Sequence, residues 1–216
     1  MSSFTDTLES SERIAYLISL NASGPRFLQS HATLTRMGFI VKVVNPPYIG
    51  RLQGDKARSN KLAHLEAIKD ISLGMNPWGY SFEDDVVEHE NSSTTISDII
   101  ESEHDDKKFV YLGICSTREA KRSMCGRCSH AMGFSKEGAS ELLSFAKQRH
   151  PTLAEGLCPI EQDYLDVIIE CWCKLLRGFK VIGPLQRSEL HGLPGAGHYG
   201  VFIQDRKFES IINKIP

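Results

Sequence analysis

Three consecutive carboxylates, Glu83, Asp84 and Asp85, follow the apolar and aromatic run at 78–82. Like charges side by side repel, and removing them from water is costly unless a positive charge lies among them. Carboxylate oxygens, together with phosphates and waters, form the octahedral shell that Mg²⁺ or Mn²⁺ prefers. A cation held here would neutralise a diphosphate and help it leave. The alternative interpretation is an acidic turn that points into water.

The elements that must position this acidic motif alternate along the chain. Strand-like runs at 13–20, 39–47, 78–85 and 108–114 are separated by helix-like runs at 23–38, 58–74 and 94–104. A strand at 129–135, helices at 136–150 and 160–176, and a short strand at 179–184 follow. We expect an α/β fold with a mixed, mainly parallel sheet flanked by helices. In such sheets ligands bind beyond the carboxyl ends of the strands, where the acidic motif falls.

The composition is that of an ordinary globular domain, with 216 residues, 41% hydrophobic and 24% charged. A net charge of −2 gives no general attraction to nucleic acid, and no run approaches the roughly 18 apolar residues of a membrane span. The amino terminus lacks the basic start of a signal peptide, so we expect a cytoplasmic protein. We predict one domain over 1–216, flexible at 1–12 and in a glycine-rich tail at 187–216 that closes over the site.

The six cysteines are unevenly spread, and Cys125 and Cys128 form a Cys-x-x-Cys pair with His130 close behind. A structural zinc site needs further ligands at matched spacing, and Cys171 and Cys173 are too close together to supply them. The sequence leaves thiols, a disulfide and metal ligation open for Cys125 and Cys128, and it favours a local disulfide or buried thiols over zinc.

Four segments, "AYLISLNASGPRF", "SNKLAHLEAIKDI", "FEDDVV" and "CSHAMGFSKEGASELL", carry a resemblance to a known family. Together they resemble glycosyltransferase family 25, the lipopolysaccharide-type and procollagen-type sugar transferases, and virus-encoded relatives with a GT-A fold. The likeness extends from about 13 to about 166, and the Glu-Asp-Asp (DXD-like) motif matches without change. Ala63 replaces the usual serine, Met132 replaces a tyrosine, and Leu20 and Asn21 stand in reversed order.

The resemblance implies a metal-dependent glycosyltransferase with a GT-A-like fold. Such an enzyme moves a hexose from a nucleoside-diphosphate sugar, UDP-linked by the family's default, to a hydroxyl of a glycan or glycoprotein, with inversion. Mn²⁺ or Mg²⁺ would be the cofactor. Transfer of this kind passes through an oxocarbenium-like state while cations stabilise the departing diphosphate. A cytoplasmic or virus-encoded enzyme fits this chain better than a Golgi enzyme.

The resemblance also suggests roles for individual residues. The expected metal ligands are Asp85, Glu83, His198 and His191. The expected donor-binding residues are Leu20, Asn21, Arg26, Asn60, Lys61, His64, Glu83, Asp84 and His130. Asp163 is the candidate base that deprotonates the acceptor hydroxyl, with Glu161 and Asp166 as alternatives.

Two other functions stay open. A nucleotidyltransferase would also use carboxylates and Mg²⁺, but it should show a glycine-rich basic loop after the first strand, where this chain has "NASGPRF". A transferase-derived module that binds a sugar nucleotide without turnover is the second alternative, and Ala63 and Met132 leave room for it. The sugar, the base, the acceptor, retention or inversion at the anomeric centre, and the oligomeric state are not readable from the sequence.

Overall fold

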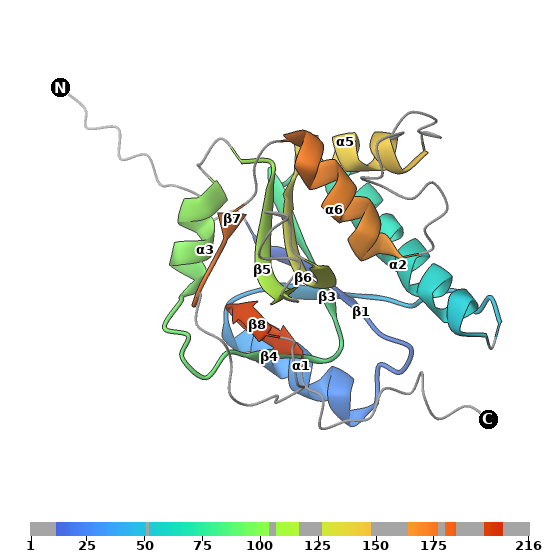
Figure 1. Ribbon diagram of the computed structural model, residues 1–216. Helices are drawn as coiled ribbons and strands as arrows, with labels where there is room; N and C mark the ends of the chain where they lie inside the picture. Colours follow the sequence, from blue (N-terminus) through green and yellow to red (C-terminus); the bar gives the residue numbers. More distant parts are fainter. Residues whose placement is uncertain are drawn as a thin grey trace.

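The computed structural model describes residues 12–50, 52–103, 107–116, 127–147, 164–176, 180–184 and 197–204. Figure 1 shows a central sheet with helices on both faces. In chain order the elements are β1 (Ile14–Ile18), α1 (Pro25–Arg36), β2 (Ile40–Val44), α2 (Gln53–Leu73), β3 (Trp78–Glu83), β4 (Val86–Glu88), α3 (Ile96–Glu103), β5 (Phe109–Ser116), β6 (Arg127–Ser135), α5 (Lys136–Lys147), α6 (Leu165–Leu176), β7 (Lys180–Val181), β8 (Gly197–Gly200) and β9 (Phe202–Gln204).

The main sheet has the strand order β2-β1-β3-β6-β5-β7, with β8 paired to β5. Strand β1 is parallel to β2 and β3, and β5 is parallel to β7. Strand β6 is antiparallel to both β3 and β5, and β8 is antiparallel to β5. All strands of this sheet except β6 and β8 therefore point the same way. The predicted α/β fold with a mixed, mainly parallel sheet flanked by helices is confirmed.

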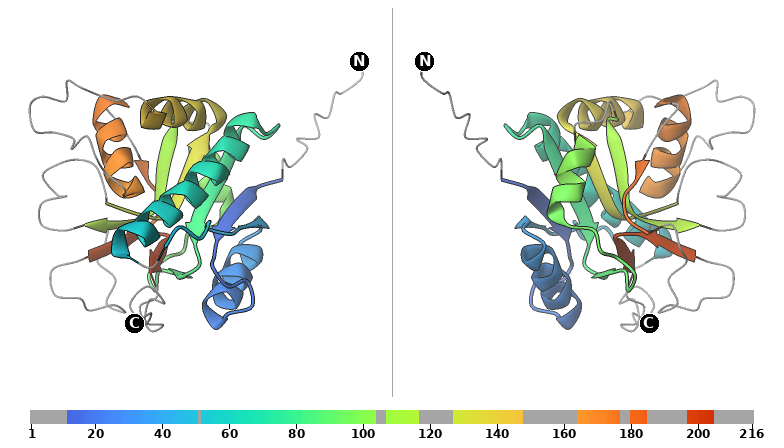
Figure 2. Two further views of the ribbon diagram at one scale, coloured as in Figure 1. Left: turned by 90° about the vertical axis from the view of Figure 1, so that its right-hand side faces the viewer. Right: turned by 90° about the vertical axis from the view of Figure 1, so that its left-hand side faces the viewer.

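The two faces of the sheet carry separate cores because side chains alternate along each strand. Tyr16 and Ile18 of β1 pack in one core with α2, α5 and α6, whereas Ala15 and Leu17 pack in the other with α1 and α3. Figure 2 shows α2 crossing one face beside α5 and α6, and α3 on the opposite face. No helix in the described ranges is both long and apolar enough to cross a membrane.

A proline and a glycine mark the two ends of helix α1. Pro25 occupies the first turn, where its missing N–H costs no hydrogen bond. Gly38 follows the helix with φ +91°, a conformation that favours glycine. Phe27 and Leu34 are buried against the sheet, whereas Leu28 is 57% exposed. The helix predicted within 23–38 is therefore present, and it buries only part of its apolar side chains.

The structure describes residues 197–204 of the segment 187–216, which the sequence predicted to be flexible, and the rest of that prediction lies outside the described residues. Residues 197–204 form β8 and β9. Val201, which lies between the two strands, is fully buried, and so are Phe202 and Ile203 of β9. Gly200 turns the chain between the two strands with φ +100°, and a Cβ there would lie 2.6 Å from the Leu112 carbonyl oxygen. Strand β9 pairs with β4, directly after the acidic motif.

Candidate active site

The acidic motif lies at the carboxyl end of β3, as the sequence predicted. Glu83 is the last residue of β3, and Asp84 and Asp85 form the turn into β4. The parallel pairing of Ile18 with Glu83 places the end of β1 beside this turn. Side chains that follow β1 and β3 can therefore meet at one edge of the sheet.

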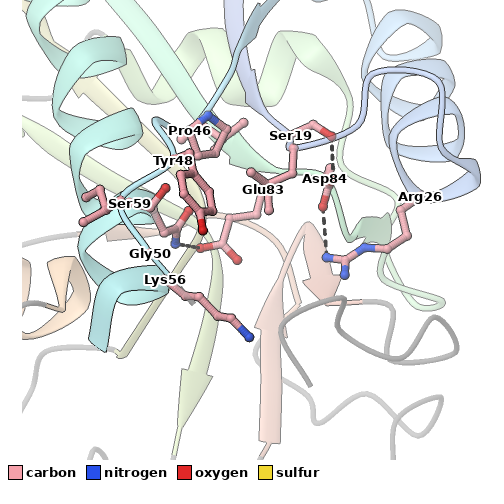
Figure 3. Close-up of a pocket in the computed structure, with 13 residues that line it drawn as sticks. Ser19, Arg26, Pro46, Tyr48, Gly50, Lys56, Ser59, Glu83 and Asp84 are labelled. Atoms are coloured by element: carbon pink, nitrogen blue, oxygen red, sulfur yellow. Dashed lines mark hydrogen bonds and ion pairs between the residues drawn. The ribbon is translucent and has the colours of Figure 1, made fainter. Parts of the chain in front are cut away.

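Asp84 and Asp85 converge on a single cation, the guanidinium of Arg26. Its Nη2 atom lies 2.9 Å from Asp84 Oδ1 and 3.1 Å from Asp85 Oδ2. The hydroxyl of Ser19 donates a hydrogen bond of 2.5 Å to the other oxygen of Asp84. Figure 3 shows Ser19, Asp84 and Arg26 joined in this way. The side chains of Arg26, Asp84 and Asp85 are 16%, 18% and 14% exposed, so the three charges are largely shielded from water.

Helix α1 holds this turn through two side chains one helical turn apart. Arg26 binds the two aspartate side chains, and Ser30, four residues later, contacts the backbone. The Ser30 hydroxyl lies 2.9 Å from the carbonyl oxygens of both Asp84 and Val86. Residues four apart share one face of a helix, so α1 fixes both the charge and the path of the acidic turn.

Glu83 has a separate set of partners. Its Oε1 accepts hydrogen bonds of 3.0 Å from Asn60 Nδ2 and Ser129 Oγ, and His64 Nε2 lies 3.4 Å away. Its Oε2 accepts a bond of 3.3 Å from Gln204 Nε2. Burial would raise the pKa of Glu83, but the hydrogen bond and charge of His64, with the Asn60 bond, outweigh it and lower this pKa from 4.5 to about 2. Glu83 is therefore an ionised carboxylate held by donors from α2, β6 and β9.

The three carboxylates do not bring three ligand atoms to a common point. In the described part of the chain, the one group of three His, Cys, Asp or Glu side chains whose ligand atoms lie within 4.8 Å of one another is Cys115, Cys128 and His130. Asp84 and Asp85, in contrast, already direct oxygens at one cationic nitrogen. Arg26 thus occupies the point on which Asp84 and Asp85 converge, whereas Glu83 binds Asn60 and Ser129.

A pocket of about 170 Å³ opens beside the acidic turn. Its lining comes from the end of β1, the first turn of α1, the loop after β2, the first turns of α2 and the end of β3: Ile18, Ser19, Leu20, Arg26, Pro46, Tyr48, Ile49, Gly50, Lys56, Ser59, Asn60, Glu83 and Asp84. In Figure 3 the Tyr48 ring lies near Pro46 on one side, and Arg26 with Asp84 lies on the other. The Tyr48 side chain is 80% exposed, so its ring is available to a ligand.

Five of the predicted donor-binding residues line this pocket: Leu20, Arg26, Asn60, Glu83 and Asp84. Asn21 lies next to them in the chain, where its backbone N–H donates to Ser19 Oγ and its side chain accepts bonds from Ser23. His64 is fully buried behind Glu83 and contacts Ser81 Oγ at 2.8 Å. Lys61 is half-buried on α2 and is not part of the lining.

The remaining predicted residues lie elsewhere or outside the described ranges. His130 is fully buried on β6, with Nε2 3.2 Å from the Phe202 carbonyl oxygen. His198 lies in β8, in register with Cys115 of β5. Asp163, the candidate base, and His191, a candidate metal ligand, lie outside the described residues.

Several residues of the site were not singled out from the sequence. Pro46 and Tyr48 belong to "NPPYIG", and their place after the carboxyl end of β2 is the signal that could have found them. Ser19 stands at the end of β1 and offered the same positional signal. Ser129 and Gln204, which bind Glu83, are 46 and 121 residues from it, and no local pattern indicates them.

Comparison with known proteins gives a distant structural likeness. No family model matches the sequence, and no curated protein matches it. The glycosyltransferase GlyE from Streptococcus pneumoniae TIGR4 is structurally similar, with a TM-score of 0.43 and 8% identity over 78% of this chain. The apo form of GlyE gives a TM-score of 0.43 with 7% identity over 79% of this chain. The aligned part spans 44% and 45% of the GlyE chains, less than half their length.

Proposed function

We propose that this protein is a metal-dependent glycosyltransferase that moves a hexose from a nucleoside-diphosphate sugar to a hydroxyl of a glycan or glycoprotein. The observation that carries the proposal is the pocket at the carboxyl ends of β1, β2 and β3. It combines an exposed aromatic ring, two cationic side chains and the carboxylates of Glu83 and Asp84 in one cavity. The sequence resemblance to glycosyltransferase family 25 supports the same class of reaction.

The pocket offers each part of a nucleoside diphosphate a matching group. The Tyr48 ring, next to Pro46, is a stacking surface for a base, which we take to be uracil. Ser19 and Asn60 offer polar groups to the ribose. Lys56 and Arg26 supply positive charge for the diphosphate, and the planar fork of Arg26 suits phosphate oxygens.

Asp84 and Asp85 are the residues that would hold Mn²⁺ or Mg²⁺, because their oxygens already converge on one positive charge. When bound, the cation supplies charge neutralisation for the departing diphosphate. Arg26 would have to release at least one aspartate to make room, and its guanidinium could then turn toward the phosphates. Glu83 keeps its donors in this proposal and acts by anchoring the end of β3.

The remaining parts of the proposal rest on the family resemblance alone. Asp163 is the proposed base that removes the proton of the acceptor hydroxyl, and direct displacement would invert the anomeric centre. His191 and His198 are proposed to complete the metal shell, and the segment around them would close over the bound donor.

The test is thermal unfolding of the purified protein with Mn²⁺ and a panel of nucleotide sugars, repeated with Asp85→Asn. A donor at 100 times its dissociation constant should add about 2.7 kcal/mol to the unfolding free energy. We expect one donor to stabilise the protein only with metal, and the effect to disappear in Asp85→Asn. Asp70→Asn, an exposed aspartate on α2 outside the pocket, is the matched control. No metal-dependent response to any donor would refute the proposal.

Turnover separates the proposed enzyme from the two alternatives. Release of free sugar or of a glycosylated acceptor in the presence of Mn²⁺ indicates a glycosyltransferase. Donor binding without either product indicates a binding module, and release of pyrophosphate from a nucleoside triphosphate indicates a nucleotidyltransferase.

A further inference from the structure

A cluster of two cysteines and a histidine lies next to the donors of Glu83. Cys115 of β5 and Cys128 of β6 form a disulfide with their Cα atoms 5.4 Å apart. His130 Nδ1 lies 4.0 Å from Cys115 Sγ. The two sulfurs and a ring nitrogen all lie within 4.8 Å of one another. The Cys-x-x-Cys pattern points to Cys125 as the partner of Cys128, but the structure pairs Cys128 with Cys115.

The orientation of His130 is fixed by its other ring nitrogen. Nε2 lies 3.2 Å from the Phe202 carbonyl oxygen, and a carbonyl can only accept, so Nε2 carries the hydrogen. The Nδ1 atom is thereby directed at the sulfurs. Histidines that bind metals usually donate their second N–H to a carbonyl or carboxylate in this way, which sets the tautomer and the direction of the ring.

We propose that, when the disulfide is reduced, Cys115, Cys128 and His130 form a site for a thiophilic divalent cation, Zn²⁺. Two thiolates and an imidazole are the ligands that zinc prefers, and three protein ligands leave a fourth position for water. Tetrahedral zinc with bonds of about 2.3 Å to sulfur and about 2.0 Å to nitrogen sets the sulfurs roughly 3.8 Å apart and sulfur and nitrogen roughly 3.6 Å apart. His130 Nδ1 and Cys115 Sγ, at 4.0 Å, need only a small approach.

Reduction of the Cys115–Cys128 disulfide requires a thiol reductant as co-reactant. Two equivalents of a thiol, or one dithiol, transfer two electrons and two protons to the disulfide, which gives two cysteine thiols and an oxidised reductant. Binding of Zn²⁺ then releases the two thiol protons, because the thiolate is the ligand. The disulfide form has no thiolate to offer, so reduction switches the site on.

The cluster contacts the network around Glu83 but does not depend on the proposed sugar transfer. Gln204 Oε1 lies 3.8 Å from Cys115 Sγ, and the Nε2 of the same side chain binds Glu83. Ser129, which also binds Glu83, lies between Cys128 and His130 in β6. Metal binding can nevertheless be measured with no nucleotide sugar present.

The experiment titrates the fully reduced, full-length chain with Co²⁺ and then with Zn²⁺. We expect the thiolate-to-cobalt charge-transfer band and the intense visible absorption of a tetrahedral site, both removed by Zn²⁺. The variants Cys115→Ser, Cys128→Ser and His130→Gln each remove a direct ligand, so each should weaken binding by more than the roughly 10- to 100-fold that loss of an outer-shell partner costs. Cys125→Ser and Cys173→Ser are the matched controls and should bind as the unchanged protein does. The disulfide form should give no thiolate band.

Three outcomes would overturn the inference. One is a reduced, folded chain that shows no thiolate band. Another is binding that disappears in Cys125→Ser but persists in Cys115→Ser, which would assign the metal to the Cys-x-x-Cys pair. The third is a reduced chain that loses its circular dichroism signal and does not recover it with Zn²⁺. Recovery of the signal with Zn²⁺ would support the site.

Discussion

Replacement of Arg26 by methionine removes the positive charge that Asp84 and Asp85 share. Removal of one partner from a fully buried ion pair costs about 3–5 kcal/mol, because the remaining charge stays in a poorly solvated place. The two aspartates are 18% and 14% exposed, so water reaches them in part. We therefore expect Arg26→Met to lower the unfolding free energy by about 2–3 kcal/mol. For a chain of this size that corresponds to a fall in Tm of about 4–12 °C.

Divalent cations should reverse this loss. In the unchanged protein a cation must displace the guanidinium from the aspartates, whereas in Arg26→Met it meets two open carboxylates. If displacement costs the same 2–3 kcal/mol, the variant should bind Mn²⁺ about 30- to 150-fold more tightly. Thermal unfolding across a Mn²⁺ titration, without nucleotide, measures both the loss and its recovery.

Arg36→Met is the matched control for this experiment. Arg36 lies on the same helix and pairs with Glu88 at 2.8 Å, but its side chain is 66% exposed. Exposed pairs of this kind contribute about 0–1 kcal/mol, so the control should change Tm little. Our reasoning about Arg26 would be refuted if Arg26→Met were as stable as Arg36→Met, or if Mn²⁺ stabilised the variant no more than the unchanged protein.

Three further predictions concern other parts of the structure. The pKa of Glu83 is lowered from 4.5 to about 2, so its contribution of roughly 3 kcal/mol is present above pH 4.5 and is lost as the pH falls toward 2. Glu83→Gln should flatten the fall in unfolding free energy across that range, measured by denaturant titration at each pH. Tyr48→Ala should raise the dissociation constant of the donor by about 5- to 150-fold, from about 1–3 kcal/mol of lost stacking, with Tm unchanged. Calorimetric titration checks this, and Tyr164→Ala, an exposed tyrosine outside the pocket, should bind the donor normally. Gly113→Ala would place a Cβ 2.4 Å from both His130 Nε2 and the Phe202 carbonyl oxygen, so chemical denaturation should show a loss of about 1–3 kcal/mol.

Much of the fold could be predicted because local patterns determine it. The aromatic run before the acidic motif identified β3, and the spacing of Phe27 and Leu34 identified α1. The direction of a strand is harder to predict from the sequence, because β6 would have the same apolar pattern whether it ran parallel or antiparallel to β3. The strand β4 was missed because three residues carry too little pattern, and its partner β9 lies more than 110 residues along the chain.

The candidate site could be predicted in part. Glu83, Asp84, Arg26 and Asn60 were singled out from the sequence, and these four side chains line one pocket, whereas Asp85 is not part of its lining. Their roles stay predictions. The sequence did not reveal that Glu83 faces different partners from its two neighbours. That difference arises because successive side chains alternate at the end of a strand, and because Ser129 and Gln204 reach Glu83 from distant strands.

The bond between Cys115 and Cys128 has a consequence for how this chain is handled at the bench. The two residues are 13 apart, so the bond closes a covalent ring around the segment between them. Any single backbone cut inside that ring leaves the two parts of the chain joined. A nicked molecule would therefore run as one species on a denaturing gel without reductant, and it would separate into fragments only when reductant is added. Mass spectrometry of the intact protein would reveal such a nick as the gain of one water.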